Sequence, residues 1–225
     1  MTLAGLLAVC GFADTANTFT YNGTPASTGY NEDVSASFIV SSGNLLVTLS
    51  NTTANLTYDK QILTGVLFTY AGAGSATGAV SNPTTTGYNI DDTNGALTSA
   101  GSVSANWKTE TGDLTGYVTL TNLNNGNHAG SQGIVSTSTN SSGTNNLANH
   151  DVFLEGPLQF SISGLGLTSA SQITGVEFNF GTAIGTETSV VAGALTPDPE
   201  PTPFVLLSAG LIAISWVDRK RFAKP

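Results

Sequence analysis

The stretch that decides the fold is Val34–Leu49, which reads VSASFIVSSGNLLVTL. Every second residue from Val34 to Val40 is apolar, and the same holds from Leu45 to Leu49. Because successive side chains of a strand point to opposite faces, each half places its apolar set on one face. Ser42-Gly43-Asn44 between them is typical of a tight turn. The stretch therefore predicts a β-hairpin with one buried face.

The period-two pattern recurs along the middle of the chain, and no stretch there has a convincing helical period. Further strands are expected in Ile62–Tyr70, Gly116–Leu120, Leu158–Ile162 and Val176–Phe180. Short strands separated by turns such as Asn94-Gly95 and Asn125-Gly126 are typical of a sandwich or jelly roll. We expect one all-β domain, a β-sandwich or jelly roll, over residues 14–195, with Gly130–Asn149 as an exposed loop or a partly disordered insertion.

Charge is unevenly distributed along the 225 residues. Four of the six basic residues lie in the last seven positions, which leaves 14 acidic and two basic residues before Asp218, a net charge of −12. Nucleic-acid phosphates attract lysine and arginine, so such a domain is not expected to bind nucleic acid. Anionic lipid surfaces should repel it as well.

The N-terminal segment Leu3–Phe12 (LAGLLAVCGF) has the length of a signal-peptide apolar region. Small residues favour cleavage after Ala13, with Ala16 as a second candidate, so residues 1–13 are expected to be a signal peptide. The usual basic segment is missing, so either the true start precedes Met1 or the signal is weak. Lipidation of Cys10, the one cysteine, is a rival interpretation. Without Cys10 the remaining chain has no thiol for a disulfide or a metal.

The C-terminal segment has three parts. Alternate prolines in residues 196–203 favour an extended linker. Phe204–Val217 (FVLLSAGLIAISWV) contains no charged residue and spans about 21 Å as a helix, less than the hydrocarbon core of about 30 Å. Its length alone also fits a buried core helix. Because it lies between prolines and a basic cluster, a transmembrane helix over 204–217 is expected, with residues 218–225 cytoplasmic and the acidic domain outside.

Pro199-Glu200-Pro201, the apolar segment and the cluster Arg219, Lys220 and Arg221 resemble the PEP-CTERM tail of exosortase substrates. The resemblance implies a sorting motif at Pro199–Pro201 and a membrane stop at Arg219–Arg221. It further implies export in a Gram-negative bacterium, anchoring in the inner membrane, removal of the tail by an exosortase, and delivery to the cell surface or to the extracellular matrix of a biofilm.

The domain also resembles one group of exosortase-dependent surface proteins, in Phe38–Leu49, Ile62–Phe68 and Phe160–Phe180. That group has no activity that could be transferred to this chain. A structural role is therefore expected, and a carbohydrate-binding module for a matrix polysaccharide is the alternative. The exosortase, an exopolysaccharide and the inner membrane are the expected partners.

No catalytic residue, metal site or cofactor is expected. His128 and His150 are the only histidines, and Asp151 follows His150, but neighbours on a strand point to opposite faces. Asp91–Gly95 (DDTNG) lacks the spacing of an EF-hand loop, so a simple turn is expected, with an irregular calcium site as the alternative.

Two further features leave alternatives open. Glycosylation sequons begin at Asn22, Asn51, Asn55 and Asn140, in a chain so rich in Asn, Ser and Thr that chance matches are expected. O-linked glycans on Gly130–Asn149 are equally open. Trp107, near Tyr117 in the expected fold, could stack on sugars, although a buried core position is the commoner outcome for tryptophan.

Overall fold

The computed structural model describes residues 16–24, 29–54, 56, 58–71, 78–91, 96–111, 117–123, 132–136, 152–181 and 190–196. Within these ranges, regular structure is β-strand apart from two short 3-10 turns, η1 (Asp59–Gln61) and η3 (Ala170–Gln172). The all-β prediction is therefore confirmed. None of the described segments is a helix long and apolar enough to cross a membrane, and the segments 1–13 and 197–225 lie outside the described residues.

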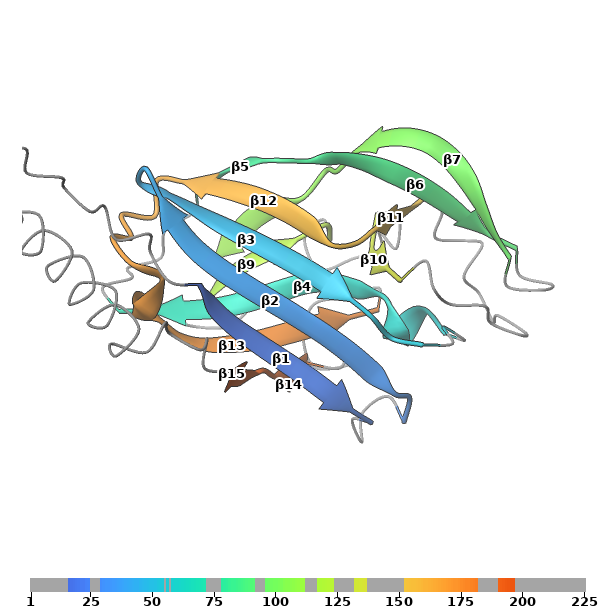
Figure 1. Ribbon diagram of the computed structural model, residues 1–225, viewed down its shortest axis with the longest axis horizontal. Coiled ribbons are helices and arrows are strands. Elements are labelled where there is room, and N and C mark those ends of the chain that lie inside the picture. Colours follow the sequence, from blue (N-terminus) through green and yellow to red (C-terminus); the bar gives the residue numbers. More distant parts are fainter. Residues whose placement is uncertain are drawn as a thin grey trace, which may run out of the picture.

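The strands form two sheets (Figure 1). The first has the order β15-β1-β2-β3-β12-β5. Its strands are β15 (Ala194–Thr196), β1 (Asn17–Gly23), β2 (Glu32–Ser41), β3 (Asn44–Asn51), β12 (Leu158–Ser163) and β5 (Ala79–Ser81). The second has the order β14-β13-β4-β10-β11-β6-β7, with β9 also paired to β4 and β8 paired to β9. Its strands are β14 (Val190–Ala192), β13 (Ile173–Phe180), β4 (Leu63–Tyr70), β10 (Ile134–Val135), β11 (Phe153–Glu155), β6 (Thr84–Ile90), β7 (Leu97–Ser104), β9 (Val118–Thr121) and β8 (Lys108–Thr111).

The expected hairpin forms as β2 and β3, paired from Val34↔Asn51 to Ser41↔Asn44. Its two-residue loop has positive φ at both positions, 52° at Ser42 and 79° at Gly43. Two positive φ values give a turn whose twist matches the right-handed twist of the strands. The other expected strands also form: β12 and β13 where alternation predicts them, and β4 and β9 within runs rich in β-forming residues.

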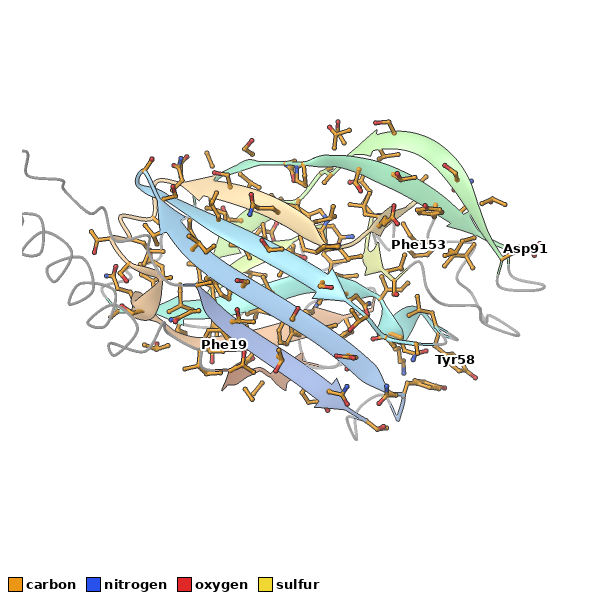
Figure 2. All side chains as sticks on the ribbon, in the orientation of Figure 1. Phe19, Tyr58, Asp91 and Phe153 are labelled. Carbon is orange, nitrogen blue, oxygen red and sulfur yellow. The ribbon has the colours of Figure 1, made fainter. Side chains whose placement is uncertain are left out.

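One core fills the space between the two sheets. Phe38 of β2 and Phe68 of β4 are both fully buried, and their ring centroids lie 5.4 Å apart, so the sheets touch here. Phe19 of β1 makes a T-shaped contact with Phe38, with ring centroids 5.9 Å apart, and Figure 2 labels its position. Alternate residues of β3, β12 and β13 complete the same cluster. Burial of these side chains is the main source of stability for the two-layer arrangement.

A smaller apolar cluster lies on the other side of the second sheet. It contains Leu56, Ile62, Ile90, Val135 and Phe153. The neighbours of these residues in the chain, such as Leu63, Ile134 and Leu154, face the main core instead. Because side chains alternate between faces, β10 and β11 are buried on both sides.

Along continuously described segments the chain crosses between the sheets at four places. It passes from β5 to β6 through Asn82-Pro83, from β11 to β12 through a cis Gly156-Pro157 bond, from β12 to β13 through residues 164–172, and from β14 to β15 through Gly193. Buried Asn51, at the end of β3, links the sheets near the second crossing, because its Nδ2 donates to the carbonyl of Ile134 in β10 at 3.0 Å. These crossings connect the two layers to each other.

Candidate functional site

The part of the fold nearest the expected sorting tail is the last strand segment, β14–β15. β14 pairs with β13 of the second sheet, and β15 pairs with β1 of the first. The register places Thr196 opposite Thr18, and the Thr196 hydroxyl donates to the Thr18 carbonyl at 2.9 Å. The residues directly before the tail are therefore held by both sheets.

Gly193 makes this crossing sterically feasible. A Cβ at this position would lie 3.0 Å from Cε2 of Phe178 and 3.1 Å from Cβ of Phe19, which is closer than ordinary packing contacts. Its N–H donates to the Val176 carbonyl at 2.9 Å. A residue without a side chain lets the backbone pass between two core aromatics, one from each sheet.

Gly193→Val is expected to destabilise the domain by about 1–3 kcal/mol, because the added methyl groups must displace Phe178 or Phe19. Denaturant unfolding of both proteins measures the difference. Ala194→Val is the matched control, since Ala194 is exposed and its change should stay within about 0.5 kcal/mol. Equal effects of the two substitutions would contradict the close approach at Gly193.

The last strand spans the expected boundary between domain and linker. Leu195 ends the expected domain and Thr196 begins the expected linker, but both lie in β15. Leu195 is the one large apolar side chain of the described part that is strongly exposed, at 55%. The strand ends immediately before Pro197, consistent with the lack of a backbone donor in proline. The sorting motif Pro199–Pro201 and the membrane stop Arg219–Arg221 lie outside the described residues.

The catalytic and metal candidates are not brought together in the part that the structure describes. His128, His150 and Asp151 lie outside it, as do Asp92–Gly95, whereas Asp91 is exposed at the end of β6. The described residues contain no group of three or more His, Cys, Asp or Glu side chains placed to hold a metal.

Two described carboxylates on one face, those of Glu110 and Glu177, are too far apart to act as an acid–base pair. Glu110 and Glu177 lie in one cross-strand row on the outer face of the second sheet, separated by Thr119 and Leu67. Three strand spacings put them about 14 Å apart, beyond the roughly 5–9.5 Å of carboxylate pairs that hydrolyse glycosides. Lys108 forms an ion pair with Glu110.

Trp107 is a core residue, which is the more common position for a tryptophan and the alternative to sugar stacking. Its side chain is 2% exposed, and its ring centroid lies 5.0 Å from that of Phe160. The indole N–H donates to the Gln132 carbonyl at 3.0 Å, and the backbone exchanges two bonds with the Asn82 side chain. Trp107 therefore fixes the crossing after β5 and offers no ring face to a sugar.

Tyr117 bridges two strands on the outer face of the second sheet. Its hydroxyl donates to Oε1 of Glu177 at 2.8 Å across β4, where outward-pointing Leu67 is fully buried. This hydrogen bond to Glu177, with desolvation and the carboxylate charge, raises the pKa of Tyr117. Burial raises the pKa of Tyr70, and burial together with nearby Glu155 raises the pKa of Tyr88.

These shifts predict a loss of stability in alkali. An unfolded tyrosine releases its proton near pH 10, while the folded tyrosines keep theirs to higher pH. Above about pH 10 the unfolded chain therefore binds fewer protons than the folded chain. The free energy of unfolding falls as pH rises through that range. Urea unfolding at about pH 8 and pH 11 measures the fall, and Tyr117→Phe should reduce it. A free energy that stays constant through this window would contradict the shifts.

The sequons differ in accessibility. Asn22 is exposed in β1. Asn51 is 2% exposed, and its Nδ2, the atom that would carry a glycan, donates to the carbonyls of Gln61 at 2.9 Å and Ile134 at 3.0 Å. The folded domain therefore excludes a glycan at Asn51, while Asn55 and Asn140 lie outside the described residues.

Comparison of the chain with family models, with curated proteins and with solved structures finds no match.

Proposed function

We propose that the chain is the exported precursor of a surface or extracellular-matrix protein, processed at its C-terminus by an exosortase. One observation carries this proposal. The motif Pro199-Glu200-Pro201, the uncharged segment Phe204–Val217 and the cluster Arg219–Arg221 follow one another directly after β15, the strand that completes the domain. The order matches the PEP-CTERM tails described above.

In this proposal Phe204–Val217 is a transmembrane helix that holds the precursor in the inner membrane. Trp216 suits a membrane interface, and the long side chains of Arg219–Arg221 can extend the reach of a short helix by snorkelling. The excess of positive charge keeps the tail in the cytoplasm and places the acidic domain, which we regard as a β-sandwich, outside. Removal of the tail then releases the domain to the cell surface.

In this proposal the domain has a structural role and no enzymatic activity. The described phenylalanines and Trp107 lie in the two apolar clusters of the domain. Glu110 and Glu177 are too far apart to act as a pair. The acidic surface keeps copies soluble and apart outside the cell.

Processing can be tested by expression in a bacterial host with and without an exosortase. With the enzyme, the chain should lose its tail and leave the membrane fraction, and without it the full chain should remain with the membrane. Replacing Pro199, Glu200 and Pro201 together by alanine should abolish cleavage, because the motif is lost. Replacing Thr202 and Pro203 by alanine is the matched control and should leave cleavage intact. Retention of the tail by the unchanged chain in the presence of the enzyme would contradict the proposal.

A second candidate function, binding of a matrix polysaccharide, is favoured by one aromatic pair. Tyr30 and Tyr58 are both partly exposed, and their rings stack at 4.2 Å with an interplanar angle of 29°. Figure 2 shows Tyr58 at the end of the domain near η1. Aromatic faces of this kind can pack against the apolar faces of sugar rings.

Glycan arrays with and without calcium test this candidate. Tyr58→Ala should weaken any polysaccharide binding several-fold by removing one ring of the pair. Tyr117→Phe keeps its ring and lies on another part of the domain, so it should bind as the unchanged chain does. If the chain binds no polysaccharide, including those of the bacterium that produces it, the structural role is the one proposed function that remains.

A further inference from the structure

The edge strands of the two described sheets differ in length. β15 and β5 end the first sheet, while β14, β7 and the branch strand β8 end the second. β15, β5 and β14 have three residues each, and β8 has four, among them the ion pair Lys108–Glu110. Short strands and charges of this kind protect a sheet edge against pairing with other chains. β7 (LTSAGSVS) has eight residues and contains no proline and no charged residue, so it lacks both forms of protection.

β7 is also open to solvent. Five successive residues, Thr98–Ser102, are exposed, and in the described part of the chain β6 is its one strand partner. Figure 1 shows β7 as the outermost strand at the top of the view, beside β6. The side of β7 away from β6 is therefore accessible to another strand.

Hydrogen bonds at the two ends of β7 show which of its backbone groups point away from β6. The Ala105 N–H donates to the Pro83 carbonyl at 2.9 Å, and the Asp91 N–H donates to the Ala96 carbonyl at 3.0 Å. In an antiparallel pair, every second residue bonds to the partner strand, and the residues between them point away. Counted along the register from both ends, the residues with outward N–H and C=O groups are Leu97, Ser99, Ser102 and Ser104.

Gln132 covers one end of this outward row. Its Nε2 donates to the Ser104 carbonyl at 3.3 Å. Within the described residues, the outward backbone groups of Leu97, Ser99 and Ser102 have no hydrogen-bond partner. The open part of the edge therefore runs from Leu97 to Ser102.

A β-bulge gives the outward row an irregular spacing. Ala100 is an extra residue on β7, so the register with β6 shifts between Gly87 and Tyr88. The outward groups of Ser99 and Ser102 are therefore three residues apart instead of two. A regular strand presents its outward groups every two residues, so it can match one half of the row but not both.

We propose that the open edge of β7 binds β7 of a second copy of this chain, in antiparallel orientation about a two-fold axis. A second copy carries the same irregular spacing. Ser99 of each copy then lies opposite Ser102 of the other, and each such pair exchanges two backbone hydrogen bonds. The outward row is symmetric about the midpoint between Ala100 and Gly101, as a two-fold interface requires.

The antiparallel orientation also keeps the acidic ends of the two strands apart. Asp91 ends β6, and Asp92 follows it in the segment 92–95, which lies outside the described residues. In the two-fold pair these segments lie at opposite ends of the joined strands, separated by at least the length of β7, about 27 Å. This exceeds the screening length of about 8–10 Å. Pairing still works against the general repulsion between acidic copies, so it should strengthen as salt is added.

The paired surface is small, which sets where the association can form. One strand pair is much smaller than the roughly 1,200–2,000 Å² that stable interfaces bury. The association is therefore expected to be weak in dilute solution and to form where copies are concentrated, as at a cell surface or in a matrix.

Disulfide trapping in the full chain tests the register. In a Cys10→Ser background, Ser99→Cys and Ser102→Cys are made separately, mixed in detergent at high protein concentration, and oxidised. Opposite residues in such a pair have Cα atoms about 5.5 Å apart, within the disulfide range of about 4.4–6.8 Å. Like residues lie about 10 Å apart along the strands. The mixture should therefore give several-fold more cross-linked dimer than either variant alone.

A cysteine on another strand supplies the background for this experiment. Ser163→Cys, exposed at the end of β12, is mixed with Ser99→Cys to measure cross-linking by random collision. Cross-linking of the Ser99 and Ser102 variants that does not exceed this background would overturn the inference. Equal cross-linking by the mixture and by each variant alone would contradict the two-fold register. A β7 cysteine that cross-links in the native host to another protein alone would overturn the second copy as the partner.

Sedimentation of the full chain in detergent tests the edge itself. Ser102→Pro removes an outward N–H that β6 does not use, so it should weaken self-association at least several-fold and keep the fold. Ser102→Thr keeps the N–H and is the matched control, which should associate as the unchanged chain does. Any association through Phe204–Val217 is common to all three chains.

Denaturant unfolding checks that Ser102→Pro keeps the fold. If it does not, Ser102→Lys replaces it, since a lysine on an edge strand also opposes pairing. An unchanged chain that is monomeric at every concentration would overturn the inference, as would a folded edge variant that associates equally well. Neither result bears on removal of the C-terminal tail, because β7 belongs to the domain that processing retains.

Discussion

Phe38→Ala is expected to lower the free energy of unfolding by about 3–5 kcal/mol, one of the two largest effects that we predict for a single substitution. Phe38 is fully buried where the two sheets meet, with ring contacts to Phe19 at 5.9 Å and Phe68 at 5.4 Å. Alanine would remove apolar burial and leave a cavity between rigid neighbours. Denaturant unfolding of the full chain in detergent measures the loss.

Ile39→Ala is the matched control for Phe38. Ile39 is the next residue on β2 but points to the opposite, partly exposed face of the first sheet. Its truncation removes less buried apolar area and should cost at most about half as much. A larger cost at Ile39 than at Phe38 would mean that the faces of β2 are assigned the wrong way round.

Asn51→Ala is expected to cost about 3 kcal/mol, the second of the two effects. The Asn51 amide donates to the carbonyls of Gln61 and Ile134 and accepts from the Thr53 N–H at 3.0 Å. Truncation leaves three backbone groups without this partner, and each unsatisfied buried group costs about 1–3 kcal/mol before water or relaxation reduces the total. Chemical unfolding measures the loss.

Asn22→Ala supplies the comparison for Asn51. Asn22 also begins a sequon, but it is exposed, so its truncation should change stability by no more than about 0.5 kcal/mol. Similar small effects at both positions would contradict the role of Asn51 as a link between β3 and β10. Asn51 was recognisable from the sequence only as a sequon, because both of its acceptors come from distant parts of the chain.

The strands that sequence patterns predict correctly are those with one buried face. β2, β3, β12 and β13 alternate apolar and polar residues, and each contributes its apolar face to the core. β4 is buried on both faces and was recognisable from its run of β-forming residues. Local sequence patterns are enough to predict these strands because their apolar residues are also the residues that are buried.

Other strands could not be predicted from local pattern. β7 (LTSAGSVS) exposes most of its side chains, so it has little apolar periodicity, and its pairing with β6 defines it instead. β15 has only three residues, all exposed, and its sequence reads as the start of a proline-rich linker. Its pairing with β1 joins residues 178 positions apart, which no local signal indicates. The sorting motif shows the reverse: it is recognisable from sequence order and lies outside the described residues.

The central claim is that the chain is sorted by removal of its C-terminal tail. The most direct measurement is mass spectrometry of the mature protein isolated from its native host. The account predicts a mature C-terminus near Pro201, with Phe204–Pro225 missing and the strands through β15 retained. A mature protein that still ends at Pro225 would contradict the account, and the resemblance of residues 199–221 to a sorting tail would then be accidental.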